Sequence, residues 1–374
     1  MNTATHNLHS EVRLNTLSLI NFKNYDQANF SFCSKINCLV GNNGAGKTNV
    51  LDAIYYLSMT KSSLNPVDSQ NIRYGTDFFV IQGEYQRDGV SESIYCGMKR
   101  GQRKVFRRNK KDYERLSEHI GLLPVVMISP ADSNLITGGS EERRKLINEV
   151  ISQYNHNYLH DMMQYNRALE QRNALLKKFA ENHAFDADVL DIWTEQLAST
   201  GNRIYQYRAE FCRELIPVFQ KYYDEVSGGG ENVELIYSSQ LHDRDFNALL
   251  NESLDKDRHL HFTTTGIHKD DLLLQMNGMP IKKSGSQGQQ KTFLVSLKLA
   301  NFNFISQHSR ITPILLLDDI FDKFDALRVG QIIRVVSDRQ FGQIFITDTG
   351  RENIEKILQQ TDCIYQLHQL PVIS

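Results

Sequence analysis

The chain has 374 residues, of which 40% are hydrophobic, 23% charged and 10% aromatic, a composition typical of a folded globular protein with about two domains. Lys and Arg number 42 and Asp and Glu number 44, so the formal net charge is −2 and any site for a polyanion must be a local patch. Five cysteines without Cys-x-x-Cys spacing argue against a disulfide framework or a zinc ribbon, and no apolar run reaches the roughly 18 residues of a membrane span. We therefore expect a cytoplasmic protein with no membrane partner.

The first 118 residues predict a strand-rich region with one helix. Runs of alternating or continuous apolar residues predict strands at 12–19, 28–32, 36–40, 78–85, 93–98 and 104–108, with a hairpin turn at 99–102. A helix is expected at 49–57, directly after the continuously apolar strand 36–40. This succession predicts an α/β sheet with an antiparallel addition.

The segment between strand 36–40 and helix 49–57 carries the strongest motif of the chain, Gly-x-x-x-x-Gly-Lys-Thr. All eight of its residues are expected to contact a nucleotide: Gly41, Asn42, Asn43, Gly44, Ala45, Gly46, Lys47 and Thr48. The glycines let backbone N–H groups converge on phosphate oxygens, and the helix N-terminus adds a partial positive charge. We expect ATP as the ligand, with Lys47 between its β- and γ-phosphates and Thr48 as a ligand of Mg²⁺. The alternative is a glycine-rich turn that binds nothing.

The predicted hairpin at 99–111 is rich in basic residues, although the net charge of the chain is close to zero. The candidates for contacts to DNA phosphates are Arg100, Arg103, Lys104, Arg107, Arg108 and Lys110, with Phe106 and Tyr113 nearby. Such contacts would be sensitive to salt and largely blind to base sequence. The alternative is a solvated hairpin whose charges are balanced by acids elsewhere.

The middle of the chain predicts helices rather than strands. Apolar residues at steps of four from Leu146 predict two long amphipathic segments between 141 and 226, separated by the polar stretch 181–183. Pro217 should kink or divide the second segment, and Gly228–Gly230 should end it. We assign residues 119–261 to a mainly helical arm inserted between two parts of one head, residues 1–118 and 262–374.

The α/β pattern returns near the end of the chain. After a strand at 233–237 and a short helix near 246–254, a helix from 289, a buried strand at 314–317, another helix and a strand at 343–347 are predicted. The strand at 314–317 ends in two acids: Asp318 is expected to hold the metal with Thr48, and Asp319 to polarise the attacking water. Because these acids lie far from Lys47 in sequence, the head has to be assembled from both ends of the chain.

The loop Ser284–Lys291, Ser-Gly-Ser-Gln-Gly-Gln-Gln-Lys, opens a predicted helix and resembles the signature loop of ABC-type ATPases. The resemblance implies that Ser286, Gln287 and Gly288 of one subunit face the γ-phosphate held by the other subunit, so that two ATP molecules lie in a head-to-tail homodimer. Asp325 resembles the D-loop aspartate that faces the partner subunit. Ser286 therefore joins Lys47, Asp318 and Asp319 as a catalytic candidate. An ordinary Ser–Gly helix cap is the alternative.

Nearly the whole chain resembles the RecF family of bacterial recombination mediators, which is related to the SMC and Rad50 ATPases. The matching segments are residues 19–25, the phosphate loop, and residues 121–130, 142–145, 165–177, 266–272, 286–290 and 315–325. The resemblance implies a weak ATPase, stimulated by DNA, whose ATP-bound dimer clamps DNA and releases it on slow hydrolysis. It also implies partners: double-stranded DNA, single-strand/double-strand junctions or gaps, RecO and RecR, and indirectly RecA, in the nucleoid region of the cytoplasm.

Some positions depart from the family pattern. Ala131 stands where an acidic residue is usual, and 347–349 reads Thr-Asp-Thr where transporter ATPases carry a switch histidine, so we expect no histidine switch. The cluster His268–Asp271 could suggest a metal site, but its single histidine favours a structural or interface role.

Three other functions have been weighed against the clamp. An SMC-like ATP-gated DNA tether is disfavoured because residues 119–261 hold no sustained heptads and no Cys-x-x-Cys hook. A transporter ATPase would need a membrane partner. A fused nuclease would need a catalytic metal domain, and little sequence follows the last predicted strand of the sheet.

Overall fold

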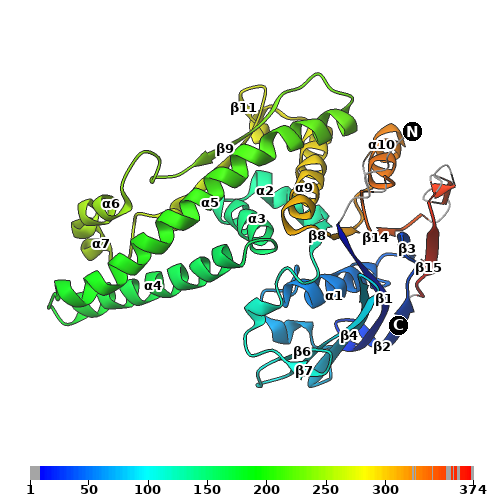
Figure 1. Ribbon diagram of the computed structural model, residues 1–374, viewed down its shortest axis with the longest axis horizontal. Helices are drawn as coiled ribbons and strands as arrows, with labels where there is room; N and C mark the ends of the chain where they lie inside the picture. Colours follow the sequence, from blue (N-terminus) through cyan, green and yellow to red (C-terminus); the bar gives the residue numbers. More distant parts are fainter. Residues whose placement is uncertain are drawn as a thin grey trace. The chain divides into compact units, whose positions relative to one another are not determined.

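The computed structural model describes residues 9–321, 324, 326–338, 340–350, 355–356, 358–359 and 363–371 (Figure 1). Contacts divide the chain into two compact units: Met1–Asp132, Lys221–Gly229 and Lys291–Ser374 form the first, and Ser133–Gln220 and Gly230–Gln290 form the second. These boundaries differ from the predicted ones. Residues 119–132 belong to the first unit because they contain strand 125–128 of its parallel sheet. Residues 262–290 belong to the second unit because strand 271–276 pairs with strand 233–238.

A five-stranded sheet of the first unit draws its strands from both ends of the chain. Its order is β15-β3-β14-β13-β8, and every neighbouring pair is parallel. The strands are β3 (Ile36–Val40), β8 (Val125–Ile128), β13 (Ile314–Leu317), β14 (Ile344–Asp348) and β15 (Tyr365–Gln369). Every residue of β3, β8 and β13 is buried, as expected of the continuous apolar runs typical of parallel strands. The predicted assembly of the head from both chain ends is therefore observed in this sheet.

A second sheet of the first unit is largely antiparallel, as the spacing of the predicted strands indicated. Its order is β12-β1-β4-β5-β6-β7, with β2 also paired to β1. The strands are β1 (Ser10–Phe22), β2 (Tyr25–Ser31), β4 (Phe78–Arg87), β5 (Val90–Lys99), β6 (Val105–Arg108), β7 (Lys111–Asp112) and β12 (Ile311–Thr312). The predicted turn at 99–102 is present, with Gln102 N donating to Lys99 O at 3.0 Å.

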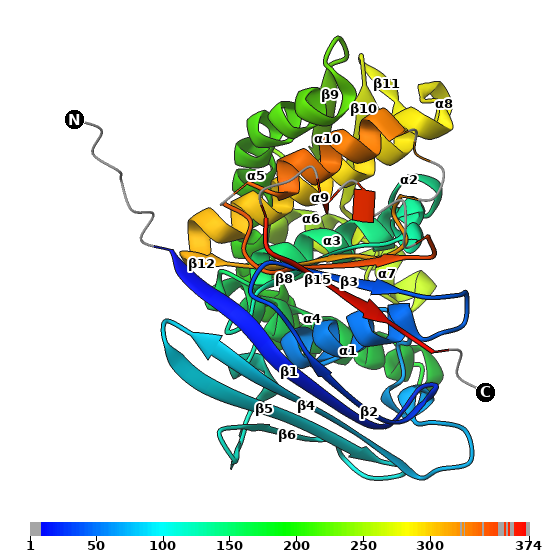
Figure 2. The ribbon, with the colours of Figure 1, turned by 90° about the vertical axis from the view of Figure 1, so that its right-hand side faces the viewer.

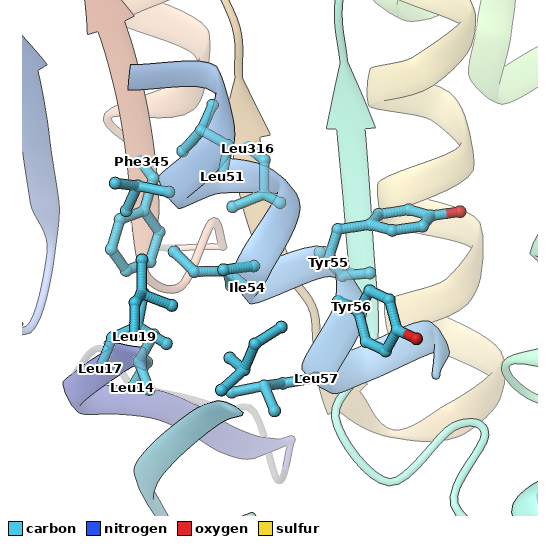
Figure 3. Packing of buried hydrophobic residues seen from close by; sticks show 14 of the residues in the cluster. Leu14, Leu17, Leu19, Leu51, Ile54, Tyr55, Tyr56, Leu57, Leu316 and Phe345 are labelled. Carbon is cyan, nitrogen blue, oxygen red and sulfur yellow. The ribbon is translucent and has the colours of Figure 1, made fainter. Parts of the chain in front are cut away.

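Helix α1 (Lys47–Met59) fills the space between these two sheets (Figures 2 and 3). Leu51 and Ile54 lie toward Leu316 and Phe345 of the parallel sheet, while leucines of β1 and Leu57 close the core on the antiparallel side (Figure 3). Eleven residues of α1 are buried, so the helix has no freedom to shift. This packing fixes the place where α1 begins, directly after the glycine-rich loop. The unit also contains α10 (Ala326–Val336), most of α9 (Gln287–Ser309) and the short helices η1 (Asp68–Asn71), η2 (Leu116–Glu118) and η3 (Pro130–Ser133).

The second unit is mainly helical. Its helices are α2 (Asn134–Thr137), α3 (Ser140–Ser152), α4 (His156–Glu181), α5 (Ala187–Ser227, whose last turns belong to the first unit), α6 (Phe246–Glu252), α7 (Leu254–Leu260), η4 (Ile267–Lys269) and α8 (Ile281–Ser284). It also contains a small antiparallel sheet, β11-β10-β9, built from β9 (Val233–Ser238), β10 (Asp271–Met276) and β11 (Met279–Pro280). The sequence analysis predicted β9 and missed β10, although Leu272, Leu274 and Met276 alternate into the core.

One prediction about the long helices is wrong, and of the two outcomes expected at Pro217, a kink or a division, the division does not occur. The first long segment is two helices, α3 and α4, because Asn155 caps a new helix: its Oδ1 accepts a hydrogen bond from Tyr158 N at 3.0 Å. Pro217 does not divide the second segment, and α5 runs through it. Pro217 is exposed, so a carbonyl left without its helical partner can face water. The expected end of α5 is correct, since Gly228–Gly230 all have positive φ directly after Ser227.

Candidate functional site

The glycine-rich loop joins β3 to α1 in the geometry of a phosphate cradle. Gly44 and Gly46 have φ of 85° and 87°, which favours glycine, and a Cβ at Gly46 would lie 2.7 Å from the Tyr25 hydroxyl. Lys47 is buried, and its Nζ donates to Gly41 O at 2.7 Å and to Asn42 O at 3.0 Å. The ammonium group thus folds back over the loop and has neutral carbonyl partners, which a phosphate oxygen can replace.

The turn between β1 and β2 supports this loop from one side. The Tyr25 hydroxyl donates to Gly46 O at 3.2 Å, and burial raises the pKa of Tyr25, so the phenol keeps its proton. Asn49 Nδ2 donates to Asn24 Oδ1 at 2.7 Å, and Lys23 Nζ lies 2.6 Å from a carboxylate oxygen of the fully buried Asp52. Sequence reasoning gave these residues no role. The one indication in the sequence was that Lys23, Asn24 and Tyr25 belong to segment 19–25, which resembles the family and contacts the phosphate loop in the structure.

The predicted metal-side carboxylate meets the loop where the parallel strands end. Thr48 Oγ1 donates to Asp318 Oδ1 at 2.9 Å, and Thr347 Oγ1 donates to the same oxygen at 2.9 Å. Asp318 is only 4% exposed, and burial raises the pKa of its carboxyl group while the two hydroxyls oppose that rise. Thr48 and Asp318, far apart in sequence, are therefore in contact as predicted.

Thr347 is a site residue that the sequence analysis missed. Besides its bond to Asp318, it accepts a hydrogen bond from Asp319 N at 2.8 Å, and Asp319 has a φ of 47°. The order β3-β14-β13 explains this position: β14 lies between the strand that leads into the loop and the strand that ends in the acids. The Thr347 hydroxyl therefore positions the Asp318 carboxylate and the Asp319 backbone at the same time.

The residues present fit a magnesium ion. The Thr48 hydroxyl and the Asp318 carboxylate are hard oxygen ligands that already lie in contact, and Mg²⁺ is typically held by one or two protein oxygens together with substrate phosphates. Among the residues that the structure describes, no group of three or more His, Cys, Asp or Glu side chains could form an all-protein metal site. The His268–Asp271 cluster is thus not such a site.

The signature-like loop forms a helix cap in the second unit. Ser286 is exposed; its Oγ accepts a hydrogen bond from Gln289 N at 3.3 Å, and Gln289 Oε1 accepts one from Ser286 N at 2.7 Å. This reciprocal pair is a capping box at the start of α9. Gln287 is also exposed and Gly288 is half-buried. Asp325 lies outside the described residues.

The six basic candidates of the hairpin fall into two sets. Lys104 is 2.9 Å from Asp68, Arg107 is 2.6 Å from Asp112, and Arg108 makes two hydrogen bonds to Glu92. Arg100, Arg103 and Lys110 are exposed and form no ion pair with any described residue. Of the two aromatic neighbours, Phe106 is buried at 3% exposure and Tyr113 is half-buried, and both pack on His119.

The His268–Asp271 cluster is a structural network of the second unit. Asp270 and Arg208 are both buried and lie 3.0 Å apart, and Arg143 binds Asp271 through two hydrogen bonds of 2.7 and 2.9 Å. His268 Nδ1 accepts from the Tyr165 hydroxyl at 2.8 Å, and its Nε2 lies 3.1 Å from Thr263 O. These contacts give the residues of the matching segment 266–272 a structural role within the second unit.

Segment 165–177 has a structural role of the same kind. The guanidinium of Arg172, 1% exposed, lies 2.7 Å from Asp257, which is fully buried, and also donates to Thr263 Oγ1 at 2.7 Å. Asn173 Oδ1 accepts a hydrogen bond from Thr263 N at 2.7 Å. The helix α4 is thereby tied to the segment that follows α7.

Known proteins resemble the chain over nearly its full length. The family described as RecF/RecN/SMC N terminal domain matches residues 13–370. The DNA replication and repair protein RecF of Flavobacterium johnsoniae is 51% identical over 359 residues, covering 96% of this chain and 100% of that protein. The protein of the same name from Bacteroides thetaiotaomicron is 50% identical over 96% of both chains.

Solved structures agree with these sequence matches. The structure of the recombination mediator protein RecF-ATPrS in the RecFOR pathway has a TM-score of 0.86 at 29% identity, covering 97% of this chain and 98% of that chain. The Smc head domain from Pyrococcus furiosus, solved with the C-terminal domain of ScpA, has a TM-score of 0.57 at 15% identity, covering 97% of this chain and 94% of that chain, a likeness of fold. Within the described ranges, every helix is too short or too polar to span a bilayer.

Proposed function

The chain belongs to the RecF family, and from that premise we propose that it is an ATP-dependent DNA-binding protein of recombinational repair and replication-fork maintenance. In this proposal ATP joins two copies head to tail, the dimer clamps DNA, and slow hydrolysis releases it. The observation that carries the proposal is the contact of Thr48 with Asp318 beside the phosphate loop. It unites the two halves of a nucleotide site from opposite ends of the chain.

The nucleotide is proposed to lie across the start of α1. Its phosphates would replace the loop carbonyls as partners of Lys47, and the backbone N–H groups at the N-terminus of α1 would add donors. A cavity of about 540 Å³ lined by Asn24–Phe30, Ala45 and residues 368–371 adjoins the loop and offers room for the base and ribose. The cavity supports a whole nucleotide as the ligand rather than free phosphate.

Hydrolysis is assigned to the two acids that end β13. Thr48 and Asp318 would hold Mg²⁺, which supplies charge neutralisation for the β- and γ-phosphates when bound. Asp319 would accept a hydrogen bond from the attacking water and orient it, while Thr347 keeps the Asp319 backbone in place. We expect this activity to be weak and stimulated by DNA.

The dimer is proposed to form through the exposed signature loop. Ser286 and the backbone at Gly288 would donate to the γ-phosphate held by the second copy, at the N-terminus of the 23-residue helix α9. In a monomer the Ser286 hydroxyl caps its own helix, and a hydroxyl that accepts from Gln289 N can still donate its proton to a phosphate. Asp325 is proposed to face the partner copy, as its resemblance implies.

DNA is proposed to bind the basic hairpin. Arg100, Arg103 and Lys110 would contribute most of the phosphate contacts because they are exposed and form no ion pair with described residues. Lys104, Arg107 and Arg108 would each have to leave a carboxylate partner before binding a DNA phosphate. The proposed targets are duplexes and single-strand/double-strand junctions or gaps. Work with RecO and RecR toward loading of RecA, in the nucleoid region of the cytoplasm, completes the proposal.

The molar mass in solution tests this function. Light scattering of Asp319→Asn should give a dimer with ATP and Mg²⁺, a monomer with ADP, and a dimer that retains a short duplex at low salt. Ser286→Arg is the matched variant: it should bind ATP normally but stay monomeric, because the added side chain blocks the γ-phosphate contact. A monomer for Asp319→Asn under every condition would overturn the clamp while leaving the nucleotide site in place.

A further inference from the structure

The antiparallel sheet of the first unit has one face in the core and one face in solvent. On β4, Phe79 and Ile81 are fully buried, whereas Phe78 is 42% exposed. Because side chains alternate along a strand, the odd residues of β4 face α1 and the even residues face away. Figure 2 shows β4, β5 and β6 side by side, with α1 on one side of them.

The strand register places aromatic and basic side chains together on the solvent face. Phe78 pairs with Lys99, Gln82 with Tyr95, and Tyr95 with Arg107; Val80, Gly97 and Val105 form the row between them. Directly paired residues lie on the same face of a sheet. We call this surface the outer face and define it by Phe78, Tyr95, Gly97, Lys99, Val105 and Arg107.

The outer face is shaped as a platform for flat rings. A Cβ at Gly97 would lie 2.7 Å from the Tyr95 hydroxyl, so the Tyr95 side chain lies across Gly97 in space that another residue would fill. The Arg107 guanidinium lies 5.4 Å from the centre of the Tyr95 ring, and the Arg107 side chain is 43% exposed. Val105 is 38% exposed at the neighbouring position. Phe78 and Val105 are thus exposed and Tyr95 is half-buried on this face, although the sheet has a buried face that could hold apolar groups.

The charge of the outer face favours a polyanion as its occupant. Lys99 ends β5 at the outer face, and Arg100 and Arg103 follow it directly in the exposed turn. Of the nearby acids, Asp112 is paired with Arg107, and Glu84 lies toward the other end of the strand and accepts hydrogen bonds from Ser93 and Gln82. Asp77 is exposed directly before Phe78, so the cations Lys99, Arg100 and Arg103 remain in excess at this end. Aromatic rings flanked by free cations are the chemistry that holds unpaired bases and their phosphates.

We infer that the outer face binds single-stranded DNA by stacking unpaired bases on Phe78 and Tyr95. The inference rests on the proposed function and deepens it: the exposed cations of the hairpin take duplex phosphates, and the neighbouring platform takes the unpaired strand. Bases inside a duplex are stacked on one another and cannot reach these rings. The two surfaces together would make a junction of duplex and single strand the preferred ligand.

Binding to three DNA probes tests the inference. The probes are a short oligo(dT) strand, a blunt duplex, and the same duplex with an oligo(dT) tail that carries 2-aminopurine, whose fluorescence falls on stacking. Phe78→Leu and Tyr95→Leu keep apolar bulk but remove the stacking ring. Each should weaken binding of the single strand and of the tailed duplex by about 5- to 100-fold, the range for loss of one base–aromatic stack, and should reduce the quenching. Affinity for the blunt duplex should not change.

Matched variants separate stacking from other effects. Tyr95→Phe should retain binding and quenching, and Val90→Ser, which changes a residue 61% exposed at the other end of β5, should change neither. Thermal unfolding identifies any variant that fails to fold. Equal losses on the blunt duplex and the single strand, or full quenching by Phe78→Leu and Tyr95→Leu, would overturn the inference.

The wild-type protein distinguishes this inference from the proposed function. With ATP it should bind all three probes, the tailed duplex most tightly. If it binds the blunt duplex but gains nothing from the tail, the outer face is not a single-strand site and the clamp stands. If it binds no DNA, both are overturned.

Discussion

The phosphate-loop region of the first unit and the arginine network of the second unit use the same kinds of residues in opposite ways. In the network, Arg172 and Arg208 are buried and each lies within 3.0 Å of a buried carboxylate. In the phosphate-loop region, Lys47 has two backbone carbonyls as partners, and Asp318 has two hydroxyls. The buried ions of the network are thus paired with opposite charges, whereas Lys47 and Asp318 have neutral partners. Only the supporting pair of Lys23 and Asp52, beside the loop, resembles the network.

The difference shows how a binding site can be told from a structural cluster in this chain. A buried ion pair satisfies both groups and leaves nothing for a ligand. Within the part of the chain that the structure describes, Lys47 is held by neutral carbonyls and the Asp318 carboxylate by neutral hydroxyls, so the charges of both side chains stay available to a ligand. Segments 165–177 and 266–272 were also among the matching segments, yet their buried charged residues, Arg172 and Asp270, are paired within the fold. Changes in the two regions should therefore have different consequences.

The largest effect is expected in the arginine network. Asp270→Ala leaves the Arg208 guanidinium buried without its carboxylate, which should cost about 3–5 kcal/mol in the free energy of unfolding. Urea unfolding measures this loss. Asp255→Ala is the matched control, because Asp255 is 96% exposed beside Arg258 and should cost less than about 1 kcal/mol. A similar small loss for both variants would remove the contrast between the regions.

Lys47→Ala should have a large effect on binding and little on stability. Loss of a charge-assisted hydrogen bond of about 1.5–3 kcal/mol corresponds to ATP affinity lowered by about 10- to 100-fold. Titration calorimetry measures the affinity. Asn43→Ala, an exposed member of the same loop, should leave the affinity nearly unchanged. ATP binding by Lys47→Ala at the wild-type level would show that the ammonium group faces no phosphate.

Two buried histidines, one in each unit, should make both units sensitive to acid. Burial lowers the pKa of His119 and of His268 from 6.5 to about 4. Below pH 6.5 the unfolded chain binds a proton that the folded chain does not, so stability present at pH 7 is lost as the pH falls toward 4. Each histidine should account for about 2 kcal/mol between pH 6.5 and about pH 5.

The histidines make matching contacts. His119 Nε2 lies 2.6 Å from Leu57 O and its Nδ1 lies 2.9 Å from the Tyr113 hydroxyl, which parallels the carbonyl and tyrosine contacts of His268. His119→Gln and His268→Gln should each flatten the pH dependence of urea unfolding. An unchanged slope in either variant would contradict a neutral histidine at that position.

The smallest effect is expected at Thr347. Thr347→Val removes the hydroxyl that binds Asp318 and the Asp319 backbone, each bond being worth about 0.5–1 kcal/mol, so hydrolysis should slow by about 5- to 30-fold. Affinity for ATP should be nearly unchanged, because Thr347 is a positioning residue. Single-turnover hydrolysis measures the rate, and Thr347→Ser should restore it. Equal losses in Thr347→Ser and Thr347→Val would contradict a role for the hydroxyl.

The parts of the site that lie within one short segment could be predicted from the sequence. The loop at 41–48 and the acids after 314–317 are local motifs, and the fold brings Thr48 and Asp318 together as predicted. Thr347 was missed because its place depends on β14 inserting between β3 and β13, which is a matter of strand order and not of spacing. The sequence feature that could have indicated Thr347 is its place at the end of an apolar strand, which it shares with Asp318.

The helices show a similar limit. The four-residue spacing from Leu146 continues through Tyr154 and Tyr158 across the break between α3 and α4, so periodicity alone could not reveal that break. Asn155 carried the signal as a helix cap. The basic hairpin was predicted with Phe106 and Tyr113 nearby, but the sequence did not reveal that Phe106 is buried and that Phe78, on a neighbouring strand, is exposed.

The position of β3 in the parallel sheet has a consequence for folding of the chain during its synthesis on the ribosome. Both of its neighbours, β14 and β15, follow it by roughly 300 residues in the sequence, so the strand that leads into the phosphate loop has no neighbouring strand until they are synthesised. At about 5–20 residues per second, the ribosome takes roughly 15–60 s to travel from β3 to β14. During that time the nascent chain leaves the five residues of β3, which are buried in the folded protein, exposed to solvent. The proposed nucleotide site is also incomplete, so we expect no ATP binding. Chains released before β13 and β14 are synthesised would lack Asp318 and Thr347, so they would have only half of the proposed nucleotide site.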